Sequence, residues 1–241
     1  MTSLLVLNPN LSKSRTTLNF SHKYYSSTST KGVKRLTKKE REKICLTDKE
    51  KEVLVGLLLG DAHIQQRLST GNSRLRYAQT VKHDAYFYHV FDLFKKYCTV
   101  DFNVIEGSHL NSTTKMSYKS LTFLTISLPC FNEYRNIFYL NNTKIVPKNI
   151  KDLLTPVGLA YWIMDDGSKI KNGLHLNTYG FTLEEVELLV KVLMNKFGLK
   201  CSIHMKDNQP RIYINYESIN TLKSLVVSHM HFSMLYKLNL E

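Results

Sequence analysis

The sequence predicts an α+β fold built from two similar halves, each ordered as helix, two strands, helix, two strands, helix. Three observations support this: two apolar helices that each end at an aspartate, a strand-turn-strand pattern after each of them, and a closing helix in each half. Packed around a pseudo-twofold axis, such halves would present their antiparallel sheets as one long saddle. We place a basic extension at residues 1–46, a first subdomain at 47–154 and a second at 155–241.

The composition favours a folded protein with a polyanionic partner. With 241 residues, 43% of them hydrophobic, the chain can fill a core. Its net charge of +13 suits nucleic acid or, as a second choice, an anionic membrane surface. No apolar run approaches the roughly 18 to 20 residues that span a bilayer. The four cysteines form no CxxC pair, so we expect reduced thiols rather than a zinc site or disulfides.

The N-terminal extension differs from the rest of the chain. Residues 1–39 contain no acidic residue and are rich in Ser, Thr, Asn, Lys and Arg. Such a segment cannot bury enough surface to fold alone. Three interpretations stay open: an organelle transit peptide, a flexible basic arm that contacts phosphates, or leftover sequence fused ahead of the folded part.

The two apolar helices have clear start signals and matching ends. A capping box, Thr47-x-x-Glu50, begins the first helix, which runs to Gly60 with Asp61 at its C-terminal end. Thr155-Pro156 begins the second, which ends at Asp166, 105 residues after Asp61 (166 − 61). Small residues lie where the partner helix would approach closely: Gly56 and Gly60 in the first, Gly158 and Ala160 in the second.

Strands, turns and further helices follow each apolar helix in the same order. In the first half we expect strands at 62–68 and 74–81, a helix at 86–97, a hairpin at 102–127 and a closing helix at 131–140. In the second half we expect strands at 168–170 and 174–178 around a Lys171-Asn172-Gly173 turn, and a helix at 183–197 stopped by Gly198. A hairpin at 201–215 turning at 207–210 and a helix at 218–230 complete that half.

Polar side chains along the expected strands suit contact with a DNA duplex. Gln, Asn, Arg and Lys read base edges in the major groove, where a two-stranded ribbon fits. An equally weighted alternative is that these side chains merely face water. The candidate DNA-binding residues are Gln65, Gln66, Arg67, Arg74, Arg76, Lys169, Lys171, His175, His204, Lys206, Asn208 and Arg211.

Two aspartates brought together at helix C-termini need a counterion. The helix macrodipole places partial negative charge at each C-terminus, so carboxylates there raise the electrostatic cost. Mg²⁺ prefers carboxylate and phosphate oxygens, and metal ions between attacking and leaving oxygens stabilise phosphodiester hydrolysis. The expected metal site comprises Asp61 and Asp166 with their neighbours Gly60 and Asp165.

With these features the chain resembles the single-chain, two-motif LAGLIDADG homing endonucleases encoded in introns. Residues 54–62 and 159–167 carry the two motifs, and the resemblance extends from about Thr47 to Leu238. The first motif departs from the pattern by ending in Ala62 instead of Gly, and the sixth positions hold Leu59 and Met164 rather than acids. These departures concern helix-end packing more than catalysis.

The resemblance implies the homing endonuclease fold and roles for six residues. Asp61 and Asp166, at the eighth motif position, would be catalytic metal ligands. Lys144 and Lys237, each after the last helix of its half, would stabilise charge on the scissile phosphate or organise the attacking water. Gln79 and Asn177, at positions that correspond in the two halves, would orient that water.

We therefore expect a monomeric, Mg²⁺-dependent endonuclease that breaks both strands of a long asymmetric DNA site and leaves short 3′ overhangs. The family and the acid-poor N-terminus together suggest a mitochondrial location. One alternative is an intron maturase, which binds intron RNA with the same scaffold, and another is a non-catalytic DNA-binding module. A zinc-dependent HNH nuclease is disfavoured, because the nine histidines lack the Cys and Asn companions of such a site.

Overall fold

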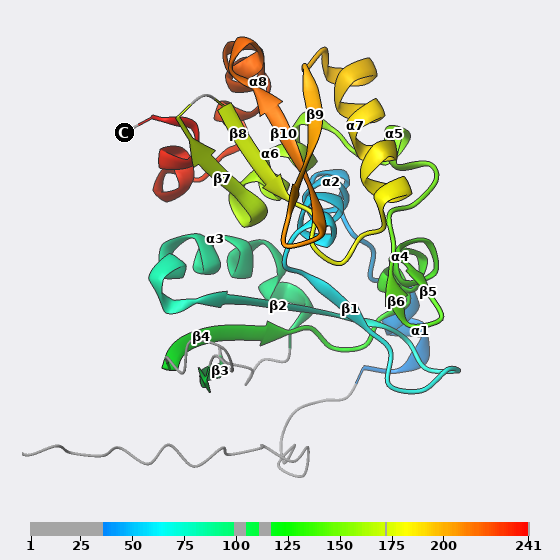
Figure 1. Cartoon of the computed structure of the whole chain (residues 1–241). Coiled ribbons are helices and arrows are strands. Elements are labelled where there is room, and N and C mark those ends of the chain that lie inside the picture. The colour runs from blue at the N-terminus through cyan, green and yellow to red at the C-terminus, as the bar shows by residue number, and fades with distance from the viewer. Residues whose placement is uncertain (1–35, 99–104, 111–116, 172, 241) are drawn as a thin grey trace, which may run out of the picture. The chain divides into compact units, whose positions relative to one another are not determined.

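The computed structural model of the chain describes residues 36–98, 105–110, 117–171 and 173–240 (Figure 1). The three interpretations of the N-terminal extension concern residues that lie almost wholly outside these ranges. Its described part includes one short helix, α1 (Lys38–Glu42), which starts at a capping box formed by Thr37 and Glu40. In the described residues no helix is long and apolar enough to cross a membrane.

The first half has the predicted order of elements. Helix α2 is followed by strands β1 and β2, helix α3, strands β3 and β4, and helix α4. The strands form an antiparallel sheet with the order β1-β2-β4-β3. Of the predicted hairpin at 102–127, residues 102–104 and 111–116 lie outside the described ranges. The bounds are α2 Asp48–Leu59, β1 His63–Gln65, β2 Arg74–Thr80, α3 Asp84–Phe94, β3 Ile105–Leu110, β4 Ser117–Leu124 and α4 Asn132–Phe138.

The second half repeats this order, which confirms the predicted α+β fold. Its antiparallel sheet has the equivalent strand order, β7-β8-β10-β9. In Figure 1 this sheet lies above that of the first half. The bounds are α6 Pro156–Asp166, β7 Gly167–Ile170, β8 Gly173–Asn177, α7 Leu183–Phe197, β9 Cys201–Lys206, β10 Gln209–Asn215 and α8 Ile219–Val226.

Two predicted boundaries are wrong because paired residues adopt left-handed backbone conformations. The helix predicted over 131–140 ends at Phe138, and β5 (Tyr139–Leu140) pairs with β6 (Thr143–Lys144) around Asn141 and Asn142, at φ 47° and 65°. The turn predicted at 207–210 is confined to Asp207 and Asn208, at φ 51° and 59°. Two consecutive residues with positive φ make the tight hairpin turn whose twist matches the flanking strands.

Helices α2 and α6 pack against each other through their glycines. A Cβ atom added to Gly56 would lie 2.1 Å from the carbonyl oxygen of Gly158, so no larger residue fits there without moving the backbone. Both helices are buried on almost every side; their buried side chains include Leu54, Leu57 and Trp162. This contact fixes where the C-terminal ends of the two helices lie. Short additional elements are α5 (Ile150–Leu153) and a 3-10 segment over Phe232–Leu238.

Candidate active site and nucleic-acid interface

Asp61 and Asp166 come from corresponding ends of the two packed helices. Asp166 is the last residue of α6, whereas Asp61 lies just beyond the end of α2 and its C-cap, Gly60. The backbone N–H of Asp61 donates a hydrogen bond to Oδ2 of Asp165, at 3.1 Å. A Cβ atom at Gly60 would lie 2.6 Å from Cβ of Asp165, so the missing side chain leaves room for this approach. The two helix ends are therefore joined directly at the acids.

The carboxylate of Asp61 lies close enough to that of Asp166 to affect its ionisation. Burial and then the charge of Asp61 raise the pKa of Asp166 to about 7, against the opposing effect of Lys144 and Lys237. Burial also raises the pKa of Asp61, although its side chain keeps access to solvent. Such a pair favours a bound cation, because a positive charge would relieve both the desolvation and the repulsion.

Lys144 and Lys237 hold equivalent places on the two helix ends. Lys144 Nζ donates to the carbonyl oxygens of Gly60 and Ala62, at 2.7 and 3.0 Å. Lys237 Nζ donates to the carbonyl oxygen of Asp165, at 2.9 Å, and to the carbonyl oxygen of Met164. A cation at a helix C-terminus opposes the macrodipole, so each lysine offsets the negative charge gathered there. Burial lowers the pKa of Lys144 to about 8 and also lowers that of Lys237.

Gln79 and Asn177 both lie at the acids but are not equivalent. Gln79 Nε2 donates to the carboxylate of Asp61, while Asn177 Nδ2 donates to the carbonyl oxygen of Asp166, at 3.2 Å. The prediction that they hold corresponding strand positions is wrong by one residue.

The strand registers show this offset. Arg76 pairs across the strands with His63, two residues after Asp61. His175 pairs with Ser168, two residues after Asp166, so Arg76 and His175 hold equivalent positions. Counting onward from Arg76 and His175, the equivalent of Gln79 is Thr178 and that of Asn177 is Ala78.

Gly60 and Asp165, also expected at the metal site, find their partners within the protein. Both carbonyl oxygens accept from lysines, as described above. Oδ1 of Asp165 accepts from the hydroxyl groups of Tyr77 and Tyr86, at 2.9 and 3.0 Å, while Oδ2 accepts from Asp61. Burial, followed by the charges of Asp61 and Asp166, raises the pKa of Asp165 well above its usual range.

The donor set fits a hard divalent cation whose coordination other molecules complete. No group of three or more His, Cys, Asp or Glu side chains suited to a metal occurs in the part of the chain that the structure describes. Asp61 and Asp166 could supply two carboxylate oxygen ligands, and phosphate and water oxygens would then fill the remaining positions.

In the first half, the predicted DNA-binding residues lie on one face of the β1–β2 ribbon and in its loop. Gln65 pairs with Arg74 across the strands, and Arg74 donates two hydrogen bonds to Oε1 of Gln65, at 3.2 and 2.9 Å. Arg76 lies two residues along the same strand and therefore on the same face. Arg67 is exposed, whereas Gln66 donates to the carbonyl oxygens of Ser69 and Gly71 and so holds the loop.

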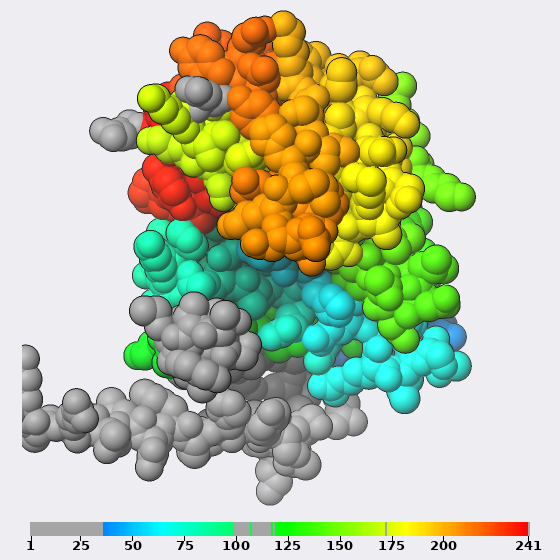
Figure 2. Space-filling view, in the orientation of Figure 1, coloured from blue at the N-terminus to red at the C-terminus, as the bar shows by residue number. Residues whose placement is uncertain are grey.

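In the second half the predicted residues divide between two faces. Arg211 on β10 pairs with Asn177 on β8 and with His204 on β9, so the side chains of these three residues lie on the same face of the sheet. His175 is on that face too but is buried and contacts His204 Nδ1, at 3.2 Å. Lys206 and Asn208 are exposed at the end of the β9–β10 hairpin, which lies along the boundary between the halves in Figure 2. Lys169 lies opposite Leu174, a core residue, and therefore on the other face.

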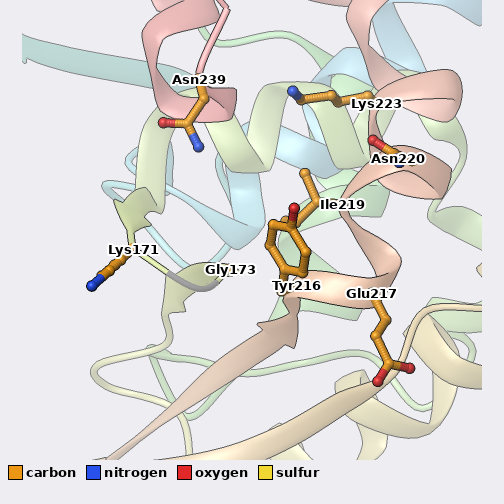
Figure 3. A pocket seen from close by; sticks show the side chains of 8 residues that line it. All are labelled: Lys171, Gly173, Tyr216, Glu217, Ile219, Asn220, Lys223 and Asn239. Atoms are coloured by element: carbon orange, nitrogen blue, oxygen red, sulfur yellow. The ribbon is translucent and has the colours of Figure 1, made fainter.

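Lys171 lies away from the acids, at the edge of a separate pocket. Its lining residues include Tyr216, Asn220 and Lys223, and in Figure 3 the side chain of Lys171 points away from them. None of the six residues assigned to catalysis lines this pocket.

Three residues near the acids were not predicted from the sequence. Tyr77 and Tyr86 contact Asp165 as described, but in the sequence they are indistinguishable from core aromatics. His83 lies close enough for its charge to lower the pKa of Asp61, and the nearby Lys237 lowers the pKa of His83 after the larger effect of burial. No spacing signal marks this histidine.

Comparisons with known proteins agree with the geometry. The model of the LAGLIDADG DNA endonuclease family matches residues 51–222. A cytochrome b mRNA maturase, bI2, of Debaryomyces hansenii is 33% identical over 79% of this chain and 74% of its own length. A probable intron-encoded endonuclease of Wickerhamomyces canadensis is 32% identical over 78% of this chain and 83% of its own length. The solved structure of the homing endonuclease I-WcaI bound to its DNA recognition sequence has a TM-score of 0.76 and 31% identity, covering 86% of this chain and 95% of that one.

Proposed function

This chain belongs to the LAGLIDADG DNA endonuclease family, and we propose that it cuts both strands of a long asymmetric DNA site by metal-dependent hydrolysis. The observation that supports this most strongly is the meeting of Asp61 and Asp166 at two packed helix ends, each with a lysine on its carbonyl oxygens. Such a paired arrangement suits a substrate with two reacting phosphodiesters.

The residues at the helix ends have distinct proposed roles. Asp61 and Asp166 would hold a divalent cation, for which Mg²⁺ is our candidate; when bound, it would stabilise charge on the oxygens of the reacting phosphodiester. Lys144 and Lys237 add fixed positive charge beside the acids and favour an approaching phosphate. Gln79 donates to the Asp61 carboxylate and so sets its orientation. Asn177 supports the backbone at Asp166 instead.

The outer faces of the two sheets are the proposed DNA-binding surface. Arg74 and Arg76 in the first half and His204, Lys206 and Arg211 in the second supply donors there. The solved relative I-WcaI is bound to its DNA recognition sequence, which supports DNA as the partner. We favour one chain as the active unit, because this chain contains both halves with their acids. An organellar location, for which we favour the mitochondrion, is proposed because similar proteins are described as intron-encoded.

The proposed function is tested by cleavage selection from a randomised duplex library with purified protein and Mg²⁺. We expect one preferred long site, cut on both strands with short 3′ overhangs. Asp61→Ala and Asp166→Ala should abolish double-strand cleavage while leaving DNA binding in Ca²⁺ intact. The matched control is Lys191→Ala, at an exposed position of helix α7, which should cut normally. Normal cutting by either aspartate variant would remove that residue from the active site.

Intron splicing is a second candidate function, favoured by the similarity to the maturase of D. hansenii. A maturase would bind intron RNA and stimulate its splicing, whether or not it cuts DNA. Splicing assays with the intron that carries the coding sequence, using the wild type and Asp61→Ala, separate the two activities. Splicing without any DNA cleavage would favour the maturase alternative.

A further inference from the structure

We propose that Asp165 is a positioning residue that fixes Asp61 from the opposite half of the molecule and is not itself a metal ligand. This inference rests on the proposed function to the extent that Asp61 takes part in cleavage. It concerns a position where the two motifs differ: the residue before the acid is Gly60 in the first and Asp165 in the second.

Asp61 needs external support that Asp166 does not need. Asp166 is within α6, so its backbone belongs to a helix, but Asp61 lies beyond the last residue of α2. On either side of Asp61, the N–H groups of Gly60 and Ala62 still bond to carbonyl oxygens of α2, at 3.1 and 2.9 Å. The N–H of Asp61 donates instead to Oδ2 of Asp165, from the other half. This bond holds the residue that carries the first carboxylate.

The other side-chain oxygen of Asp165 is held by the first half. Tyr77 on β2 and Tyr86 on α3 are both 0% exposed, so their hydroxyl groups cannot reach water. An unpaired buried hydroxyl is costly, and Oδ1 of Asp165 accepts from both. The side chain of Asp165 therefore links β2 and α3 to the backbone of Asp61.

The same contacts argue against a direct metal role for this side chain. Both oxygens face protein donors, and the two phenol groups approach one of them together. Gly60 complements this arrangement, since a Cβ there would lie 2.6 Å from both Cβ and Oδ2 of Asp165. A glycine in the first motif and an acid in the second thus form one cross-half contact.

Substitution by Ala and by Asn distinguishes positioning from metal binding. Asp165→Ala loses all three hydrogen bonds. Asp165→Asn keeps an oxygen for the Asp61 N–H, and its NH₂ group can donate to the phenol oxygens of Tyr77 and Tyr86. The two buried hydroxyl hydrogens then lose their acceptor, which lowers stability but leaves the contact with Asp61 in place. A metal ligand would not be replaced by an amide in this way. The comparator is Asp61→Asn, which should be inactive.

Two readouts are measured for each variant: the cleavage rate of each strand in Mg²⁺, and hydrogen exchange at the Asp61 amide by NMR without metal. We expect Asp165→Ala to cut about 100-fold more slowly, as for a misplaced catalytic group, and to exchange faster at Asp61. Asp165→Asn should stay within about tenfold of the wild type, as for one weakened hydrogen bond, with slow exchange. Cleavage of the DNA strand whose hydrolysis depends on Asp61 should be slowed more than cleavage of the other strand. A general loss of protein stability would instead slow cleavage of both strands equally.

A second set of variants guards against misfolding of Asp165→Ala. Tyr77→Phe/Tyr86→Phe removes only the two hydroxyl groups, and we expect it to show the same strand bias and faster exchange at Asp61. Tyr97→Phe is the matched control, because its buried hydroxyl bonds to Glu50 and to the carbonyl oxygen of Cys45 instead. It should show no strand bias.

Two results would overturn the inference: Asp165→Asn as inactive as Asp61→Asn, or Asp61 exchange unchanged in Asp165→Ala. If the wild type cuts no duplex, the proposed function fails. Amide exchange at Asp61 would still show whether Asp165 holds the Asp61 N–H.

Discussion

At the scale of single residues, Asp166 combines a proposed functional role with a cost to stability. Its pKa rises from the usual 3.8 to about 7, chiefly through burial and then through the charge of Asp61. An acid whose pKa rises on folding destabilises the folded state when ionised. The penalty is absent well below pH 3.8, grows between pH 3.8 and about 7, and is complete above that.

Asp166→Asn should therefore stabilise the metal-free protein while abolishing cleavage. At pH 8 in EDTA we expect a gain of at least about 1 kcal/mol, or about 2–4 °C in Tm, and a smaller gain at pH 4.5. Mg²⁺ should stabilise the wild type more than the variant, because only the wild type has both carboxylates. Differential scanning calorimetry measures each effect. Asp92→Asn, which alters an exposed ion pair with Lys95, is the control and should change little. An equal gain at both pH values would contradict the argument.

The candidate acids and lysines could be predicted before the structure was known, but the residues that contact the acids could not all be predicted correctly. Asp61 and Asp166 could be chosen because they end the two duplicated helices, and Lys144 and Lys237 because the family resemblance implies a basic residue after the last helix of each half. The structure places all four at the ends of α2 and α6. The pairing of Gln79 with Asn177 was wrong because a one-residue shift in a strand changes the face, which only the register reveals. The contacts of Asp165 with Tyr77 and Tyr86 join residues far apart in the sequence and left no local signal.

At the scale of elements, the glycine contact between α2 and α6 should control stability in a position-dependent way. A Cβ at Gly56 would meet the backbone oxygen of Gly158 at 2.1 Å, which only a shift of a whole helix can relieve. A Cβ at Gly158 would meet Glu52 O at 3.1 Å and the flexible side chain of Leu154 at 3.2 Å. Gly56→Ala should therefore cost about 3 kcal/mol and Gly158→Ala about 1 kcal/mol, within the range for overpacking.

Urea unfolding of both variants, followed by circular dichroism, tests this order. Gly71→Ala serves as the control, because its new Cβ would lie 3.3 Å from the nearest atom, Leu68 O, in a surface loop. Equal losses for Gly56→Ala and Gly158→Ala would show that the helices separate easily. Gly56→Ala should also lower the cleavage rate of the surviving folded protein, since the two acids depend on this contact.

Helix starts could be predicted more reliably than helix ends. Capping boxes at Thr47 and Thr182 and the Thr155-Pro156 pair specify donors and acceptors locally, and the structure has helices starting at each. Gly198 adopts the left-handed conformation expected of a C-terminal stop, at φ 67°. By contrast, the end of α4 at Phe138 depends on Asn141 and Asn142 both adopting positive φ, a choice that pairing with β6 decides.

At the scale of the whole molecule, the net charge of +13 does not say which face binds DNA. The registers show which polar side chains share a face, since they place Arg76 and His175 at equivalent points of the two sheets. The same comparison separates Lys169, which shares a face with the core, from Arg211. The outer faces of both sheets are thus the surface on which a duplex could follow the pseudo-twofold relation of the halves.

Arg76→Ala and Lys206→Ala, one from each half, should each weaken DNA binding if both sheets contact the same duplex. Where the lost contact is to a phosphate, the log-log dependence of affinity on salt should become shallower by about 0.9. Where it is to a base edge, affinity should fall by about 1–3 kcal/mol with the slope unchanged.

Fluorescence anisotropy in Ca²⁺ across a salt series measures both quantities, with Lys191→Ala on α7 as the control of equal charge change. Equal weakening by all three variants would mean that net charge alone attracts DNA. Weakening by only one of the two sheet variants would mean that a single half carries the binding, because two sheets that share one duplex must each lose affinity when a contact is removed.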